Sequence, residues 1–233
     1  MRVLVFDTET TGIDTSTAHV VELAALLFDD AGIERASLDL IIKPDGYEIP
    51  AAASAIHGIS TDLAHRVGVP LAYAASAFNA LCEQADRLVA HNLAYDVAIM
   101  EGLYRRLGKP HRMPVASNRY CTAMWSTPVC AIPPTECMRA AGRHEFKKPT
   151  LTEAYAFVCG KELVGAHNAL VDARACGEVY FELQRQRAGR EAEAEAAKAT
   201  RRQSTQSGRK GFQHKQHPET YGYSDFSVER NAK

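Results

Sequence analysis

The sequence predicts a mixed α/β domain built in layers, within residues 1–187 of the 233-residue chain. Two observations lead to this prediction. Three strand-like apolar segments follow one another near the N-terminus, and helical segments then alternate with short strands. Hydrophobic residues make up 46% of the chain, which is enough for a core of that size. This order favours an antiparallel meander that continues into strand–helix alternation.

The first three segments have the patterns of strands. Residues 3–6 form a short apolar run, and residues 19–28 read HVVELAALLF. Residues 36–42 place alternate apolar side chains on one face. A turn signal at residues 29–32 separates the second segment from the third. Short links of this kind predict three consecutive antiparallel strands.

Helical spacing dominates the next part of the chain. Residues 51–56 predict a short helix, and residues 71–85 predict a longer one. A strand is expected at residues 88–90. Asn92 is then placed to cap a helix that runs to about residue 107.

The rest of the chain is less uniform. Residues 111–148 are the least regular, with one strand expected near 119–123. A capping box at residues 150–153 opens a helix, and the last helix begins near Asn168. Residues 188–233 are rich in Ala and Glu and then in Ser, Gln and Arg. We expect them to form a charged, flexible C-terminal tail that extends the last helix briefly.

The overall charge of −1 conceals two different regions. Residues 1–187 carry 18 basic and 22 acidic side chains, whereas residues 188–233 carry 9 and 6. Basic residues are nevertheless concentrated at 102–120 and 139–148 within the acidic domain. Such stretches indicate either an anionic partner held locally or an ordinary solvated surface.

Other features bear on location and redox state. No run of about 18 apolar residues is present, so no membrane span is expected. Residues 1–3 lead into a strand pattern without the features of a signal peptide, which predicts a cytoplasmic protein. The six cysteines include no C-x-x-C pair, and we expect free thiols.

Two acids close the first predicted strand, in the sequence VLVFDTETTG. Asp7 and Glu9 lie two residues apart, so the strand period places both on one face. Two adjacent like charges are costly unless a cation joins them, and carboxylates are the ligands that Mg²⁺ or Mn²⁺ prefers. The alternative is a solvated strand end, which is the commoner outcome for such a pair alone.

Two further acids lie where strands and helices meet. Asp96 is one turn inside the helix that follows strand 88–90, at a position that is often functional in α/β sheets. Asp172 is early in the last helix, five residues after His167. Five helical residues would turn the two side chains about 140° apart, so His167 must lie on the preceding loop if both face one site.

The three motifs resemble those of one enzyme family. D-x-E in FDTETTG, N-x-x-x-D in HNLAYD and H-x-x-x-x-D in HNALVD are similar to the exonuclease motifs of DEDDh-type 3′–5′ exonucleases. This DnaQ-like group includes the epsilon subunit of DNA polymerase III and ribonuclease T. The resemblance spans about residues 1–185. It implies a ribonuclease H-like, three-layer fold with a mixed five-stranded sheet flanked by helices.

The resemblance also implies roles for particular residues. Two divalent cations, Mg²⁺ or Mn²⁺, would lie about 4 Å apart and clamp the attacking water and the leaving oxygen. His167 would be the general base. The metal ligands would be Asp7, Glu9, Asp96 and Asp172, which complete the catalytic set with His167. The residues expected to bind the 3′-terminal nucleotide are Thr8, Thr10, Thr11, Gly12, His57 and Asn92.

The expected function is hydrolysis of the 3′-terminal phosphodiester of single-stranded or frayed DNA, with release of nucleoside monophosphates. The partners are then a nucleic acid with a free 3′ end and a DNA polymerase or replication complex. One alternative is an exoribonuclease of the same family that acts on RNA or short oligonucleotides. An alternative of another class is a catalytically silent nucleic-acid-binding or polymerase-associated module. Tyr120 and Trp125 either stack on bases or belong to the core, and the core is favoured.

Overall fold

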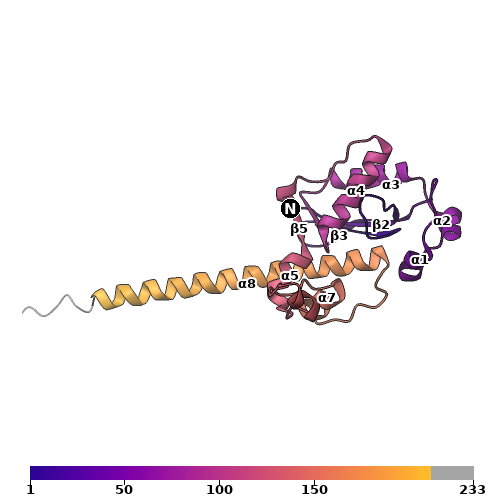
Figure 1. Cartoon of the computed structure of the whole chain (residues 1–233). Coiled ribbons are helices and arrows are strands. Elements are labelled where there is room, and N and C mark those ends of the chain that lie inside the picture. The colour runs from indigo at the N-terminus through magenta and orange to yellow at the C-terminus, as the bar shows by residue number, and fades with distance from the viewer. Residues whose placement is uncertain (211–233) are drawn as a thin grey trace, which may run out of the picture. The chain divides into compact units, whose positions relative to one another are not determined.

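The computed structural model describes residues 1–210, with side chains described through residue 202. Its centre is a five-stranded sheet in the order β3-β2-β1-β4-β5 (Figure 1). Both predictions, a mixed sheet and an antiparallel meander, are confirmed. The meander consists of β1 (Val3–Thr10), β2 (Val20–Phe28) and β3 (Glu34–Ile41). The strands β4 (Arg87–Ala90) and β5 (Arg119–Cys121) extend it in parallel with β1.

Helices cover both faces of this sheet (Figure 1). On one face lie α3 (Leu71–Cys82) and α4 (Leu93–Leu107). On the other lie α5 (Thr122–Cys130), α7 (Leu151–Cys159) and the first turns of α8 (Ala169–Lys210). The shorter elements are α1 (Ala51–His57), α2 (Thr61–Val67), α6 (Glu136–Ala140) and the 3₁₀ turn η1 (Ala116–Asn118).

The alternation along β1 assigns its side chains to the two layers. Leu4 and Phe6 are fully buried in the core that α3 and α4 cover. Val3 and Val5 pack on the opposite face, against Tyr180 and other residues of α8. Because strand side chains alternate, residues 7 and 9 continue the face that α8 covers, and residues 8 and 10 continue the face of α4.

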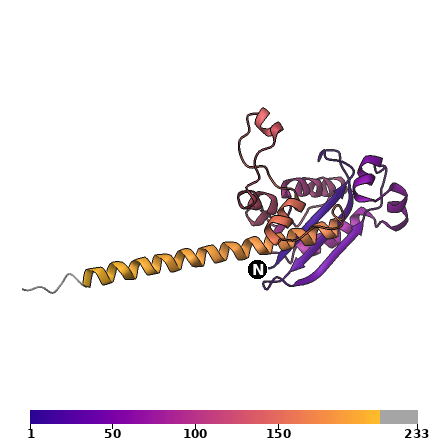
Figure 2. The ribbon, with the colours of Figure 1, turned by 90° about the horizontal axis from the view of Figure 1, so that it is seen from below.

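The start of α8 lies close against β2. Ala24 and Leu26 of β2 form a buried cluster with Ala169 and Ala173, and all four side chains are inaccessible to solvent. Alanine has a small side chain, so the helix backbone approaches the sheet closely here. In Figure 2 the three strands of the meander run side by side. The packing of Ala169 and Ala173 on β2 places the first turn of α8 over β2, beside the end of β1.

Several local predictions have clear outcomes. The capping box of α7 is confirmed, with Thr150 accepting from the Glu153 N–H and Glu153 accepting from the Thr150 N–H. Asn92 occupies the N-cap position of α4, as predicted, but it is left-handed (φ 68°) and its side chain makes no capping hydrogen bond. The least regular segment contains α5 despite Pro128 inside that helix.

The predicted tail is only partly described. Helix α8 continues through Lys210, and the remaining part of the 188–233 segment lies outside the described residues. Within residues 1–210, no helix has the length and apolar character needed to span a bilayer.

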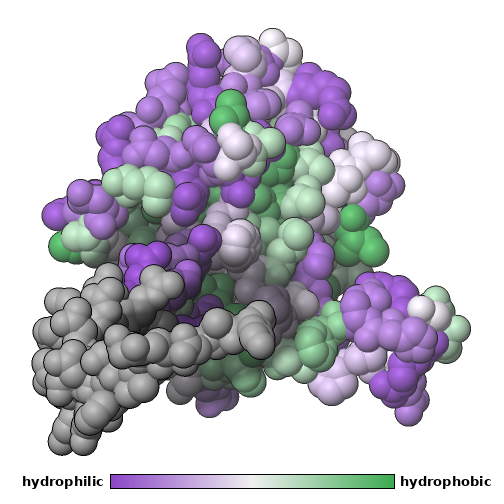
Figure 3. Space-filling model, turned by 90° about the vertical axis from the view of Figure 1, so that its left-hand side faces the viewer, coloured by the Kyte–Doolittle hydropathy of each residue, from purple (hydrophilic) through white to green (hydrophobic). Residues whose placement is uncertain are grey.

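All six cysteines are free thiols, as expected. On the face drawn in Figure 3, hydrophilic residues lie mainly around the outside of the visible surface, and hydrophobic residues lie nearer its middle.

Candidate active site

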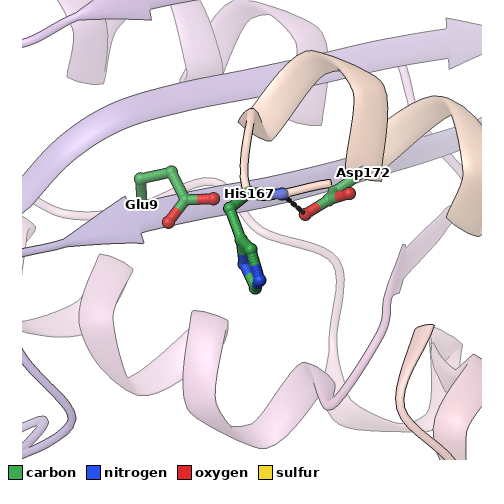
Figure 4. A group of neighbouring side chains, drawn as sticks. All are labelled: Glu9, His167 and Asp172. Atoms are coloured by element: carbon green, nitrogen blue, oxygen red, sulfur yellow. Dashed lines mark hydrogen bonds between the residues drawn. The ribbon is translucent and has the colours of Figure 1, made fainter. Parts of the chain in front are cut away.

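Three of the predicted catalytic side chains meet at the junction of β1 and α8. Glu9 comes from β1, Asp172 from the first turn of α8, and His167 from the loop that precedes this helix (Figure 4). Each offers a ligand atom, and these atoms all lie within 4.8 Å of one another. Residues from opposite ends of the domain therefore form a single constellation.

The loop before α8 has an unusual backbone that turns His167 towards this site. His167 is one of few non-glycine residues in the left-handed region, with φ 68°. Its backbone N–H donates to Oδ2 of Asp172 at 3.0 Å. The other oxygen, Asp172 Oδ1, is buried and has no hydrogen-bond partner. The prediction that His167 lies on the loop rather than on the helix is confirmed.

Asp96 approaches from the other layer. It lies in the first turn of α4 and is only 3% exposed. The Thr8 hydroxyl donates to Asp96 Oδ1 at 2.8 Å, in a buried hydrogen bond. Thr8 was expected to contact the terminal nucleotide, but its hydroxyl is used to orient this carboxylate.

The Asp7 carboxylate interacts electrostatically with the acids from both layers. Burial raises its pKa well above the usual range, and the nearby charges of Asp96 and Asp172 raise it further. Burial, followed by the charge of Asp172, also raises the pKa of Glu9 to about 7. The pKa of Asp96 is raised to about 7, again mainly by burial. The structure thus brings the four predicted carboxylates together at a cost in electrostatic energy.

This site fits a divalent cation. Its carboxylate oxygens are the ligands that Mg²⁺ or Mn²⁺ prefers, and the His167 imidazole lies beside them. The buried Oδ1 of Asp172 lacks a partner within the protein, and a buried carboxylate oxygen in that state is expensive. A cation at this point would satisfy that atom and relieve the repulsion that raises the carboxyl pKa values.

The sequence reasoning missed a fifth acid, Glu22. It lies on β2 directly opposite Glu9 and is only 4% exposed. Its pKa is raised, mainly by burial, with additional contributions from the nearby acids Asp39 and Asp172. The available signal was one acid in an otherwise apolar run, HVVELAALLF. A buried carboxylate is rare unless it is paired, so this acid could have been singled out.

A pocket of about 630 Å³ adjoins the constellation. The predicted nucleotide-binding residues all line it, namely Thr8, Thr10, Thr11, Gly12, His57 and Asn92. Two exposed apolar side chains, Ile13 and Ile56, also face it.

Tyr95 was missed by the sequence reasoning, although it directly precedes Asp96. Its hydroxyl donates to the Gly12 carbonyl at 2.8 Å and lies 2.6 Å from the Thr10 hydroxyl, which fixes the loop after β1.

His57 closes one side of this pocket as the last residue of α1. Its Nδ1 accepts from the Ile59 N–H at 3.1 Å, so the neutral ring carries its proton on Nε2. Nε2 is buried. Burial lowers the pKa of His57, which favours this neutral form, while a hydrogen bond to the Thr10 backbone opposes that shift. The ring therefore presents its N–H at the edge of the pocket, beside the Thr10 backbone.

Tyr120 and Trp125 stack on each other, with ring centroids 4.8 Å apart. The guanidinium of Arg187 lies over the Trp125 ring, 5.8 Å from its centroid. Tyr120 is buried, and its ring is also packed edge-on against Tyr180. The favoured core assignment is therefore confirmed for Tyr120, but it is wrong for Trp125, which is 46% exposed although its ring is stacked within the protein.

Comparisons with known proteins agree with these observations. A family model described as "Exonuclease" (RNase_T) matches residues 4–180. DNA polymerase III subunit epsilon of Treponema pallidum is 31% identical over 176 residues, which cover 75% of this chain and 73% of that protein. The epsilon-like protein of Rhodobacter capsulatus is 33% identical over 182 residues, which cover 77% of this chain but only 23% of the relative.

Solved structures show the same fold. Escherichia coli exonuclease I in complex with a dA16 oligonucleotide superimposes with a TM-score of 0.62 at 18% identity. The match covers 81% of this chain and 42% of that protein. The family match extends over most of the domain, and a relative at 31% identity is covered over nearly three quarters of its length. The chain therefore belongs to the exonuclease family and is a 3′–5′ exonuclease of the DnaQ-like type.

Proposed function

We propose that this exonuclease is divalent-cation dependent and removes nucleoside monophosphates from the 3′ end of single-stranded or frayed DNA. The observation behind this proposal is the convergence of Glu9, His167 and Asp172 beside a pocket of nucleotide size. Exonuclease I structures include complexes with dA16 and dT13 oligonucleotides and a zinc-bound form, which supports a DNA substrate and a metal.

Asp7, Glu9, Asp96 and Asp172 would hold two cations, Mg²⁺ or Mn²⁺. The cations would supply stabilisation of the charge that develops on the attacking and leaving oxygens. Holding them requires all four carboxylates in their ionised form, which the raised pKa values oppose in the metal-free protein.

His167 is proposed as the general base that accepts a proton from the attacking water on its imidazole. In Figure 4 the His167 side chain starts between Glu9 and Asp172, and its ring extends below both carboxylates. A residue on a short loop can adjust its ring position, while the Asp172 carboxylate fixes its backbone. This arrangement supports a proton acceptor whose position is set but whose ring stays accessible.

The pocket is proposed to receive the 3′-terminal nucleotide. Ile13 and Ile56 offer apolar surface for the base, and the loop at Thr10, Thr11 and Gly12 offers backbone and hydroxyl groups for the sugar. The Nε2–H of His57 is a suitable donor to an oxygen of the nucleotide, because the ring lines this pocket.

Digestion of matched oligomers tests the proposal. DNA and RNA of one sequence, labelled at the 3′ end, are incubated with the protein and Mg²⁺, with and without EDTA. We expect labelled mononucleotide from DNA, loss of activity in EDTA, and recovery with Mg²⁺ or Mn²⁺. Faster digestion of RNA would support the exoribonuclease alternative. Activity that survives EDTA, or cleavage at internal bonds, would contradict the proposed chemistry.

Four wider expectations remain predictions. Relatives named as DNA polymerase III subunits support an association with a polymerase and a cytoplasmic location. The basic stretches at 102–120 and 139–148 are proposed to contact phosphates farther along the strand. We also propose that residues 1–187 form the exonuclease domain, followed by the charged tail at 188–233.

A further inference from the structure

Two hydrogen bonds of Glu22 lie at the start of α8, and its carboxyl also interacts with that of Asp39 on β3. The Oε2 of Glu22 accepts from the backbone N–H of Ala169 at 2.9 Å, in a buried contact. Its Oε1 accepts from the side-chain amide of Asn168 at 3.2 Å. Glu22 and these two partners are separated by more than 140 positions in sequence. One carboxylate of β2 thus bonds two consecutive residues that lie between His167 and Asp172.

These bonds complete the cap of the helix. Asn168 is placed as the N-cap, and its Oδ1 accepts from the N–H of Val171 at 3.1 Å. The first helical N–H groups have no partner within a helix, and Ala169 carries one of them. Glu22 accepts that N–H, and a negative charge at a helix N-terminus is also favoured by the helix dipole. The buried acid and the helix start therefore satisfy each other.

The position of the helix start decides where two site residues lie. His167 directly precedes Asn168, and Asp172 is one turn after it. Glu22 is also the cross-strand neighbour of Glu9, so the sheet and helix parts of the site meet at this carboxylate. Packing of Ala169 and Ala173 on β2, and of Tyr180 on β1, holds the helix against the sheet. The Glu22 hydrogen bonds act on the first residues of the helix, beside the loop that carries His167.

We propose that Glu22 is a positioning residue for the exonuclease reaction. By accepting hydrogen bonds from Asn168 and Ala169, it fixes His167 and Asp172 over Glu9. This inference rests on the proposed roles of His167 and Asp172. Glu22 itself has no direct contact with the reacting atoms in this scheme, and its effect is carried by the loop and the first turn of α8.

A swap of the two side chains tests the hydrogen bond directly. Glu22→Gln replaces one acceptor with an amide donor, which then faces the donor of Asn168. Asn168→Asp retains the acceptor for Val171 but directs its second oxygen at the Glu22 carboxylate. In the double variant, the introduced amide donates to the introduced carboxylate and still accepts from Ala169. The pair keeps its total charge and its bonding, with the two roles exchanged.

We expect each single variant to lower kcat on a 3′-labelled DNA oligomer by at least about 10-fold, with KM within about 2-fold. The double variant should recover kcat to within about 3-fold of the original protein. Glu83→Gln is the matched control, because Glu83 is exposed and forms only a surface ion pair with Arg112. This control should leave kcat unchanged.

A second readout does not depend on activity. Amide hydrogen exchange of the peptide covering residues 165–173 should be faster in both single variants and restored in the double variant. Unchanged exchange in the single variants, or a double variant no better than either single, overturns the inference. A fall in Tm with unchanged kcat would also overturn it, since Glu22 would then only stabilise the fold.

His167→Ala, measured in parallel, separates the two proposals. Loss of activity in this variant together with full turnover in the Glu22 variants refutes the role of Glu22 and leaves the proposed function standing. Equal activity of His167→Ala and the original protein refutes the proposed base instead. The exchange measurement would then still decide whether Glu22 fixes the loop.

Discussion

Carboxylates at the two ends of the central sheet lie in opposite electrostatic environments. At one end, Asp29 follows β2, and its carboxylate accepts from the Ile33 N–H at 3.0 Å and from Arg35 at 2.7 Å. These hydrogen bonds lower its pKa. At the other end, burial and neighbouring acids raise the pKa values of Asp7 and Glu9. One end satisfies its carboxylate within the chain, whereas the other gathers carboxylates whose mutual repulsion the chain does not relieve and leaves Asp172 Oδ1 without a partner.

This difference separates a structural acid from a functional one. A carboxylate that stabilises the fold has its donors beside it in the chain, and its removal costs stability. Carboxylates that repel one another reduce stability and need an external cation. The four predictions below test whether function and stability respond in opposite directions at the two ends.

The largest effect is expected from Asp7→Asn. This change removes one charge of the proposed cation site while keeping the size of the side chain. We expect activity to fall by at least about 1,000-fold, because the lost transition-state stabilisation is several kcal/mol. Tm in EDTA should stay the same or rise, since the change relieves repulsion among buried acids. Nuclease assays and thermal denaturation measure the two outcomes, and an active variant would remove Asp7 from the site.

A smaller effect is expected from His167→Ala. Loss of a general base should lower kcat by about 100-fold to 10,000-fold, while the affinity for a DNA 3′ end changes little. Single-turnover kinetics and binding of a labelled oligomer in Ca²⁺ distinguish these quantities. A variant that turns over normally but binds poorly would show that His167 holds the substrate instead.

The pH dependence of stability should also identify the functional end. Glu9 and Asp96 have pKa values of about 7, so the folded state binds more protons than the unfolded state from about pH 4.5 to about pH 7. Stability in EDTA must then fall as the pH rises through this interval. We expect a shallower fall for Asp7→Asn, and a larger stabilisation by Mg²⁺ at about pH 8 than at about pH 5.5. Thermal denaturation across this range checks both, and a Tm that rises with pH contradicts the raised pKa values.

The smallest effect is expected from Asp29→Asn at the opposite end. The substitution weakens the hydrogen bonds to the Ile33 N–H and to Arg35, so Tm should decrease slightly. Exonuclease activity should be unchanged, because the residue lies at the end of the sheet away from Glu9. Loss of activity in this folded variant would show that the two ends are coupled.

Local sequence patterns predicted the elements that hold the site. The apolar run of β1 and its two acids, the strand before Asp96 and the loop position of His167 all follow from short-range periodicity. These features depend on neighbours in the sequence, which is why they could be predicted. The mixed sheet and its meander followed from the order of such elements.

Contacts between distant residues were not predictable in the same way. Glu22 belongs to an apolar strand, and only the tertiary structure shows that it meets Ala169. Asn92 has a residue type favoured at helix caps, but its left-handed backbone directs the side chain elsewhere. Helix α5 was missed because Pro128 interrupts the usual pattern, although the helix continues through that residue.

The meeting of β1 and α8 has a consequence for protein synthesis. Residues 7, 9 and 96 leave the ribosome well before residues 167 and 172, because the site combines the two ends of the domain. A nascent or truncated chain that stops before Gly165 contains the early acids but neither His167 nor Asp172. On the proposed roles, such a chain has no hydrolytic activity.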